Sequence, residues 1–195
     1  MVAVNFIGEQ NIIFNSKNVQ KDLSEFFLDR YKNFMKEKEI RNDIIESVSL
    51  NYNIDNILKI YKKTLILNKL ISKEIGKDLM FSYKRASNII SNELKNNKIE
   101  LTGSADPGLF KNEYEIILYK KIHEIRKDFT SIGRDGDHED ILKTLSLAKK
   151  EVNEFFDNVI VNDQDELIKK NRLELLQMLC KTFDNYLNLS KVESL

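Results

Sequence analysis

Residues that break helices are rare in this chain, whose 195 residues include one proline and six glycines. The other positions are rich in Leu, Ile, Lys and Glu, which tolerate or favour helical backbone. Alternation of apolar and polar residues never extends beyond a few positions, and its nearest approach, at residues 12–14, is weak. The sequence therefore predicts an all-α protein.

Apolar residues recur at helical spacing and divide the chain into helices. The predicted stripes lie near residues 23–34, 44–48, 54–65, 79–94, 110–125, 152–159 and 168–186. Gly76 separates the third stripe from the fourth, and residues 95–109 and 130–138 form loops. No internal repeat is evident. Six to eight helices joined by short loops predict a helical bundle.

The size and composition fit one globular domain. Hydrophobic residues make up 42% and charged residues 32%, which argues against disorder. No apolar run is long enough to span a bilayer, and residues 1–8 lack the basic region of a signal peptide. The one cysteine, Cys180, allows no internal disulfide and fits a cytoplasmic protein. We interpret it as a small buried hydrophobic residue.

Charge is unevenly distributed although the formal net charge is zero. Residues 59–98 contain ten Lys or Arg and three acidic residues, a net charge of +7, and residues 134–166 have a net charge of −6. A molecule polarised in this way can attract phosphate with one face. The alternative is that some of these lysines only keep the protein soluble.

Residues 83–90, Tyr-Lys-Arg-Ala-Ser-Asn-Ile-Ile, place polar side chains inside a helical pattern. Phe81, Arg85, Asn88 and Asn92 lie opposite the predicted core stripe of this helix. An Arg and an Asn one turn apart can hold a phosphate or a base edge, and Phe81 could stack on a base. Alternatively, Phe81 marks a second buried face of the helix, and Arg85 and Asn88 tie that face to a neighbouring helix.

Three other polar residues fall within apolar stripes and are predicted to be structural. Arg30 lies among Leu23, Phe26, Phe27 and Phe34, where it would be desolvated unless an acid or carbonyl met it. Asn171 and Arg172 flank the last stripe and are expected to face inward, bonding the preceding helix near Asp157.

Catalytic and metal-binding patterns are not evident. The two histidines, His123 and His138, are far apart, and residues 135–140 are better explained as an acidic helix start than as a calcium loop. No phosphate-binding glycine loop and no nucleophile–base arrangement is recognisable. A stand-alone enzyme therefore has no residues to support it, and no metal site is expected.

Five phrases, in order, resemble the C-terminal anticodon-binding part of the beta subunit of bacterial glycyl-tRNA synthetase. The resemblance runs from about Leu23 to the C-terminus. Ala105 replaces a usual Val, and Ile160 a usual Met. The phrases are residues 26–30 (Phe-Phe-Leu-Asp-Arg), 83–89, 105–110 (Ala-Asp-Pro-Gly-Leu-Phe), 155–162 (Phe-Phe-Asp-Asn-Val-Ile-Val-Asn) and 171–176.

The resemblance implies a bundle like the DALR anticodon-binding domain of arginyl-tRNA synthetase. In that family the alpha chain carries the class II site for ATP and glycine, and the beta chain binds tRNA. Beta chains are several times longer than this one. Residues 21–195 would then form the anticodon-binding domain, and residues 1–20 the tail of a preceding region. ATP and Mg²⁺ would belong to the alpha subunit, so no cofactor is expected in this fragment, which would itself be non-catalytic.

The implied function is to bind glycine tRNA in support of aminoacylation, together with the alpha subunit and the remainder of the beta subunit. Charge and helical geometry place the RNA surface on the +7 segment. The expected contacts are Lys62, Lys63, Lys84, Arg85 and Asn88. The alternative is a structural module that stabilises the alpha–beta assembly without touching RNA.

Overall fold

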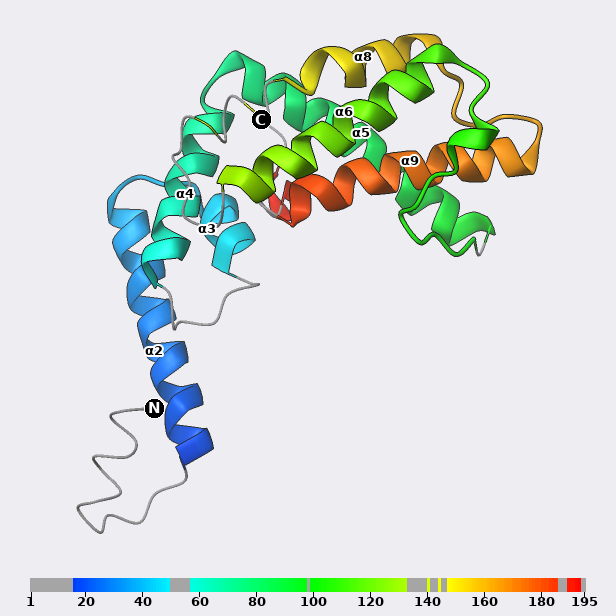
Figure 1. Ribbon diagram of the computed structural model, residues 1–195. Coiled ribbons are helices and arrows are strands. Elements are labelled where there is room, and N and C mark those ends of the chain that lie inside the picture. Colours follow the sequence, from blue (N-terminus) through cyan, green and yellow to red (C-terminus); the bar gives the residue numbers. More distant parts are fainter. Residues whose placement is uncertain are drawn as a thin grey trace.

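The computed structural model describes residues 16–49, 57–97, 99–132, 140, 144, 147–185 and 189–193 (Figure 1). These residues contain helices and no strand, so the prediction of an all-α bundle is confirmed. Residues 1–15 of the predicted tail and residues 133–139, including His138, lie outside the described residues. The elements are α2 (Ser16–Glu37), α3 (Asn42–Ser49), α4 (Ile57–Ile71), α5 (Glu74–Asn97), η2 (Pro107–Leu109), α6 (Glu113–Ile132), α8 (Lys149–Asn158), α9 (Glu166–Asp184) and η3 (Leu189–Lys191).

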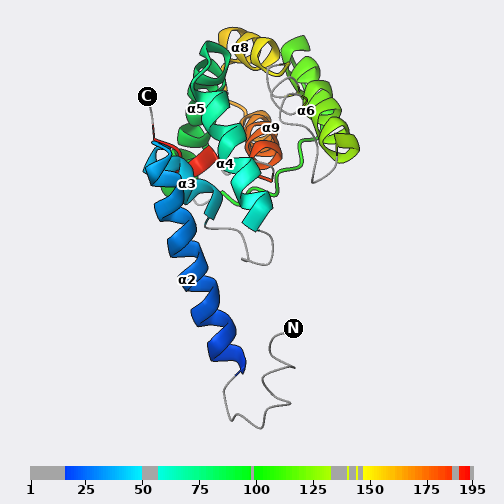
Figure 2. The same ribbon diagram turned by 90° about the vertical axis from the view of Figure 1, so that its left-hand side faces the viewer.

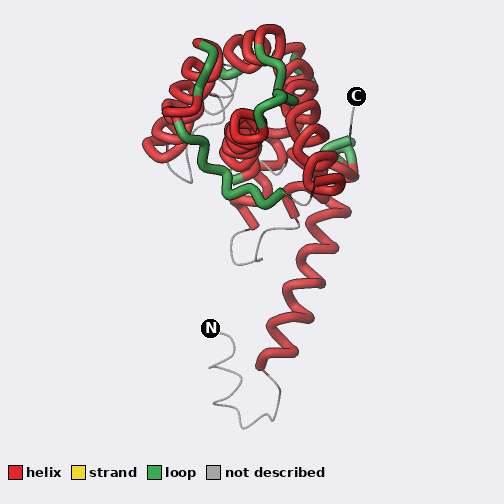
Figure 3. Tube along the Cα trace, turned by 90° about the vertical axis from the view of Figure 1, so that its right-hand side faces the viewer, coloured by secondary structure: helices red, strands yellow, loops and turns green. Residues whose placement is uncertain are grey.

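Helix α9 is the centre of the bundle. Figure 2 looks nearly along it and shows α5, α8 and α6 arranged in an arc around it, an arrangement also visible from the opposite side in Figure 3. Thirteen of its 19 residues are buried, including Asn171, Arg172 and Glu174. A helix buried on most of its surface must satisfy its polar side chains internally. Contacts made by α9 therefore decide the positions of the surrounding loops.

Helices α5 and α8 lie side by side and run in the same direction. Asp78 pairs with Lys149, the Ser82 hydroxyl donates to the Asn153 side chain at 2.9 Å, and Arg85 lies over Phe156. The residue numbers rise together on the two helices, as parallel packing requires. This pairing places the end of α8 beside the middle of α5.

Helix α2 projects away from the bundle, with only its C-terminal part packed (Figure 1). Tyr31 and Met35 are buried, and the Tyr31 hydroxyl shares a hydrogen bond with Thr64 of α4. Arg30 is exposed and its guanidinium lies 5.3 Å from the centroid of the Phe26 ring. The prediction that Arg30 is desolvated was wrong, because the described bundle leaves this part of the apolar stripe in solvent.

The break between the third and fourth predicted stripes lies at Ser72 and Lys73, so its placement at Gly76 was wrong. Gly76 is inside the first turn of α5, where a Cβ would meet the Leu70 carbonyl oxygen at 1.8 Å. Close packing of α5 against the end of α4 therefore requires glycine. Cys180 is buried as expected, and burial raises the pKa of its thiol to about 12.

Candidate nucleic-acid interface

One face of α5 forms an exposed polar stripe. At 100° per residue, its members fall within an arc of about 80°. All are exposed to solvent, and they comprise three cations, two amides and one aromatic ring. The α5 stripe consists of Lys77, Phe81, Arg85, Asn88, Asn92 and Lys95.

The two acidic residues of α5 between Lys77 and Lys95 lie off this stripe and are neutralised. Asp78 pairs with Lys149 of α8. Glu93 accepts from Lys169 of α9 at 2.9 Å, and this hydrogen bond raises the pKa of Lys169. Both pairs join helices, so the carboxylates hold the bundle together, and the stripe itself remains positively charged.

A cleft of about 460 Å³ opens beside the C-terminal half of the stripe. Arg85, Asn92 and Glu93 line it from α5, and Lys169 and Leu173 line it from α9. Its other wall is the end of α8 and the segment that follows, residues 156 and 159–162. Apolar walls with two amides, the exposed Arg85 and the Lys169–Glu93 ion pair suit a flat, partly polar group such as a nucleobase.

Arg85 joins the stripe to the cleft. Its guanidinium carbon lies 4.3 Å from the centroid of the Phe156 ring. Phe156 itself is buried, with 8% relative exposure, whereas Arg85 is exposed. An arginine stacked on an aromatic ring keeps its in-plane N–H donors and outer face available. Arg85 is thus held in place by packing and can still bind an anion or stack on a base.

Arg172 of α9 fixes the rim of the cleft from inside. Its guanidinium donates to the Ile160 carbonyl at 2.8 Å, to Asp163 at 2.6 Å and to Glu115 at 2.9 Å. Burial disfavours the charged guanidinium, but the bonds to Glu115 and Asp163 outweigh it and raise the pKa of Arg172. The prediction that Arg172 faces inward is confirmed, with these partners in place of Asp157, which is exposed.

Glu115, in the first turn of α6, completes this network. Its side chain is 0% exposed, and its second oxygen accepts from the N–H groups of Lys111 at 2.8 Å and Asn112 at 2.7 Å. The acid is therefore bonded both to Arg172 and to the start of its own helix. Three segments, residues 111–115, 160–163 and α9, meet at this one ion pair.

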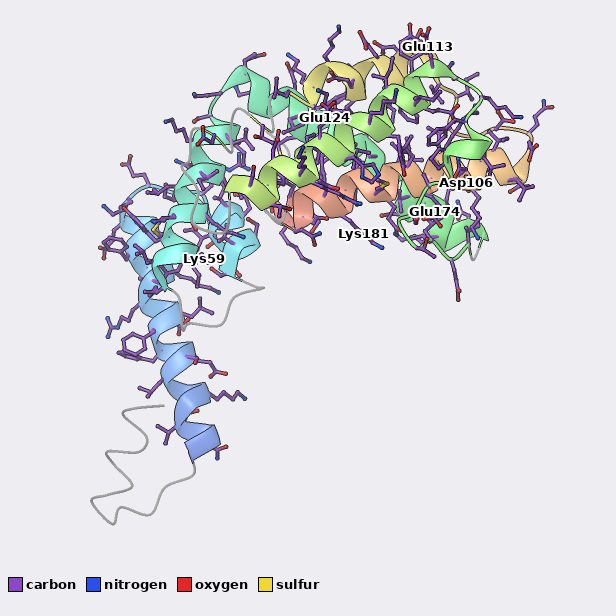
Figure 4. The ribbon with its side chains drawn as sticks, in the orientation of Figure 1. Lys59, Asp106, Glu113, Glu124, Glu174 and Lys181 are labelled. Carbon is purple, nitrogen blue, oxygen red and sulfur yellow. The ribbon has the colours of Figure 1, made fainter. Side chains whose placement is uncertain are left out.

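Asn171 and Glu174 of α9 anchor the loop between α5 and α6. Figure 4 labels Asp106 in this loop and Glu174 on α9. The Asn171 side chain accepts from the Asp106 N–H at 2.7 Å and donates to its carbonyl at 3.0 Å. The Glu174 carboxylate accepts from the N–H groups of Thr102, Gly103 and Ser104 at 2.5–3.1 Å. Side chains of α9 therefore hold this loop in place.

The predicted RNA contacts divide between two environments. Arg85 and Asn88 lie exposed on the α5 stripe, whereas Lys62 is half-buried and Lys63 is 7% exposed. Lys84 is half-buried; desolvation lowers its pKa, although the charges of Asp43 and Glu193 oppose that effect. Lys63 is buried and Lys84 is half-buried, and neither belongs to the exposed α5 stripe.

Asn92, Phe156 and Asn162 line the cleft but were not among the predicted RNA contacts. The sequence held a signal for each of them: Asn92 shares the predicted polar face with Arg85 and Asn88, and Phe156 and Asn162 belong to the family-like segment at residues 155–162. No described helix combines the length and hydropathy needed to cross a membrane. Histidine, cysteine and acidic side chains form no group of three suited to a metal ion within the part that the structure describes.

Comparison with known proteins identifies the class. The model of the DALR anticodon binding domain family matches residues 79–195, which include the cleft and all of the α5 stripe except Lys77. The chain belongs to this family. It is also similar to glycine–tRNA ligase beta subunits, with 35% identity over 187 residues to that of Rickettsia prowazekii (strain Madrid E) and 33% over 187 residues to that of Rickettsia typhi (strain ATCC VR-144 / Wilmington). Each match covers 94% of this chain and 27% of the relative, so the chain spans about a quarter of those proteins.

Proposed function

We propose that this chain binds glycine tRNA through its anticodon arm, as one part of a glycine–tRNA ligase beta subunit working in the cytoplasm. The α5 stripe would contact the phosphates of the arm through Lys77, Arg85 and Lys95. The cleft would receive an unpaired anticodon base against Phe156 and Arg85, with Asn92 and Asn162 as hydrogen-bonding groups. ATP, Mg²⁺ and the aminoacylation chemistry would belong to the alpha subunit.

The observation that carries this proposal is the position of the family match. The matched residues, 79–195, contain every element of the cleft and its supporting network. Sequence-specific recognition of RNA targets unstacked bases in loops, using aromatic or guanidinium planes and amide groups. The Arg85–Phe156 stack with Asn92 and Asn162 supplies those groups on an exposed surface that the ion pairs on either side leave positively charged.

The test is binding of the 195-residue chain to glycine tRNA and to the same tRNA with its anticodon exchanged, at two salt concentrations. The proposal predicts tighter binding to glycine tRNA and weaker binding at higher salt, because phosphate contacts release counterions. Equal affinity for both RNAs would remove anticodon recognition from this chain. No binding to either RNA would contradict RNA binding by these residues alone.

A second candidate function is a structural module that stabilises the alpha–beta assembly without touching RNA. The exposed apolar face of α2 favours it, with Leu23, Phe26, Phe27 and Phe34 each 47–52% exposed. Large apolar residues gathered on one projecting helix are typical of a protein contact. Retention of subunit association without RNA binding, together with loss of association on Phe26→Ser/Phe27→Ser, would favour this candidate.

A further inference from the structure

Phe81 is the feature of α5 that the cleft does not explain. Its side chain is 73% exposed, and it lies one turn before Arg85 on the α5 stripe. It does not line the cleft. Covering an aromatic ring of this size would be favourable, so Phe81 offers a surface on which a partner can pack.

The neighbours of Phe81 favour a nucleic acid over a protein as its contact. The other exposed phenylalanines among the described residues, Phe26, Phe27 and Phe34, occur together on the apolar face of α2. On the α5 stripe, Phe81 is the single apolar member among lysine, arginine and asparagine residues. Isolated aromatic rings between cations and amides suit single-stranded nucleic acid, where the ring stacks on a base and the cations follow the phosphates.

The spacing indicates which base would be involved. Residues four apart on a helix are about 6 Å apart along its axis, at 1.5 Å per residue. Stacked nucleotides in one strand are about 3.4 Å apart and can separate further when unstacked. Phe81 and the Arg85–Phe156 stack therefore match two neighbouring bases, one at each ring.

We propose that Phe81 is a second stacking platform, which holds the base next to the one received by the cleft. This inference rests on the proposed function, since it requires the anticodon loop to lie along α5. Phe81 would set the direction of the strand along the helix: one base stacks on Phe81, the next reaches the cleft, and the intervening phosphate lies near Arg85.

The test is the affinity of the 195-residue chain for glycine tRNA with Phe81→Ala, Phe81→Tyr and, as a control on another face of α5, Leu94→Ala. Leu94 is also exposed, at 39%. Stacking predicts that Phe81→Ala weakens binding about 5- to 100-fold without changing its salt dependence, while Phe81→Tyr and Leu94→Ala bind like the wild type. A flat response to Phe81→Ala would overturn the inference, as would an equal loss with Leu94→Ala.

Placement of the contact provides a second readout. A photo-crosslinking phenylalanine analogue at position 81 should join to a nucleotide of the anticodon loop, and the same analogue at position 94 should not. Crosslinks only to stem nucleotides, or none in a protein that binds normally, would overturn the inference alone. A wild-type chain that binds no tRNA would instead overturn the proposed function and the inference together.

Discussion

Helices α5 and α9 carry the same kinds of polar side chain, but those of α9 are buried and those of the α5 stripe are exposed. On α9, Asn171, Arg172 and Glu174 are at most 6% exposed, and every one is bonded to a loop or a neighbouring helix. On α5, Arg85, Asn88 and Asn92 are exposed. The residue type therefore does not tell a structural role from a binding role. The partners that each side chain finds within the fold make that distinction.

The two helices are connected through the rim of the cleft. Arg172 holds the Ile160 carbonyl, which places residues 159–162 opposite Arg85 and Asn92. The buried network thus holds the rim in place, and under the proposed function the exposed stripe would supply the groups for recognition. Substitutions on α9 should act on stability, and those on the stripe should act on binding.

Arg172→Ala should have the largest effect on stability. Removing it leaves Glu115 without its buried ion-pair partner, and breaking such a pair costs about 3–5 kcal/mol. For a chain of this size the melting temperature should fall by roughly 6–20 °C, and this loss of stability should be much larger than the loss of tRNA binding by the folded fraction. Thermal unfolding with Lys170→Ala, an exposed neighbour, as control measures this. An unchanged melting temperature would contradict the structural role.

Glu174→Ala should have the next largest effect. It removes the acceptor for three backbone N–H groups of the loop, but Thr102 and Ser104 are exposed and water can replace part of the loss. Bonds to a charged group contribute about 1.5–3 kcal/mol, which is the expected decrease in unfolding free energy. Urea unfolding tests it. A loss as large as that of Arg172→Ala would mean that this loop is also part of the core.

Tyr83→Phe tests the buried face of α5, opposite its exposed stripe. The Tyr83 hydroxyl donates to Asp184 at 2.8 Å, and its loss should cost about 1.5 kcal/mol at neutral pH. Burial and the charge of Asp184 raise the pKa of Tyr83 above its usual value near 10. Its contribution is therefore complete below pH 10 and is lost as the pH rises further. Urea unfolding at pH 8 and pH 11 should show the two proteins converging; parallel curves would contradict this.

Arg85→Ala should have the smallest effect on stability, less than about 1 kcal/mol, because an exposed cation–π contact contributes no more than that. Melting curves that overlay those of the wild type are the expected result. A fall comparable with that of Arg172→Ala would place Arg85 in the supporting structure and break the distinction between the two helices.

Helical periodicity predicted the bundle and the inward position of Asn171 and Arg172, because both follow from spacing along one helix. It also placed Phe81, Arg85 and Asn88 on one face. Long-range partners could not be read in this way: Glu115, for example, is 57 residues from Arg172. Helical periodicity also does not reveal whether an apolar stripe packs against a partner, which is why the environment of Arg30 was predicted wrongly. For the same reason it did not predict that Lys63 is buried.

The distinction between an exposed binding stripe on α5 and a buried structural network on α9 is tested most directly by the salt dependence of glycine tRNA binding. It should be measured for the wild type, for the double variant Lys84→Ala/Arg85→Ala and for Lys170→Ala. We expect the double variant to bind more weakly and to reduce the salt slope by about one, the contribution of Arg85, because Lys84 is half-buried and lies off the stripe. Lys170→Ala should keep the wild-type slope. An unaltered slope in the double variant, with tRNA still bound, would place the RNA surface elsewhere and contradict the account.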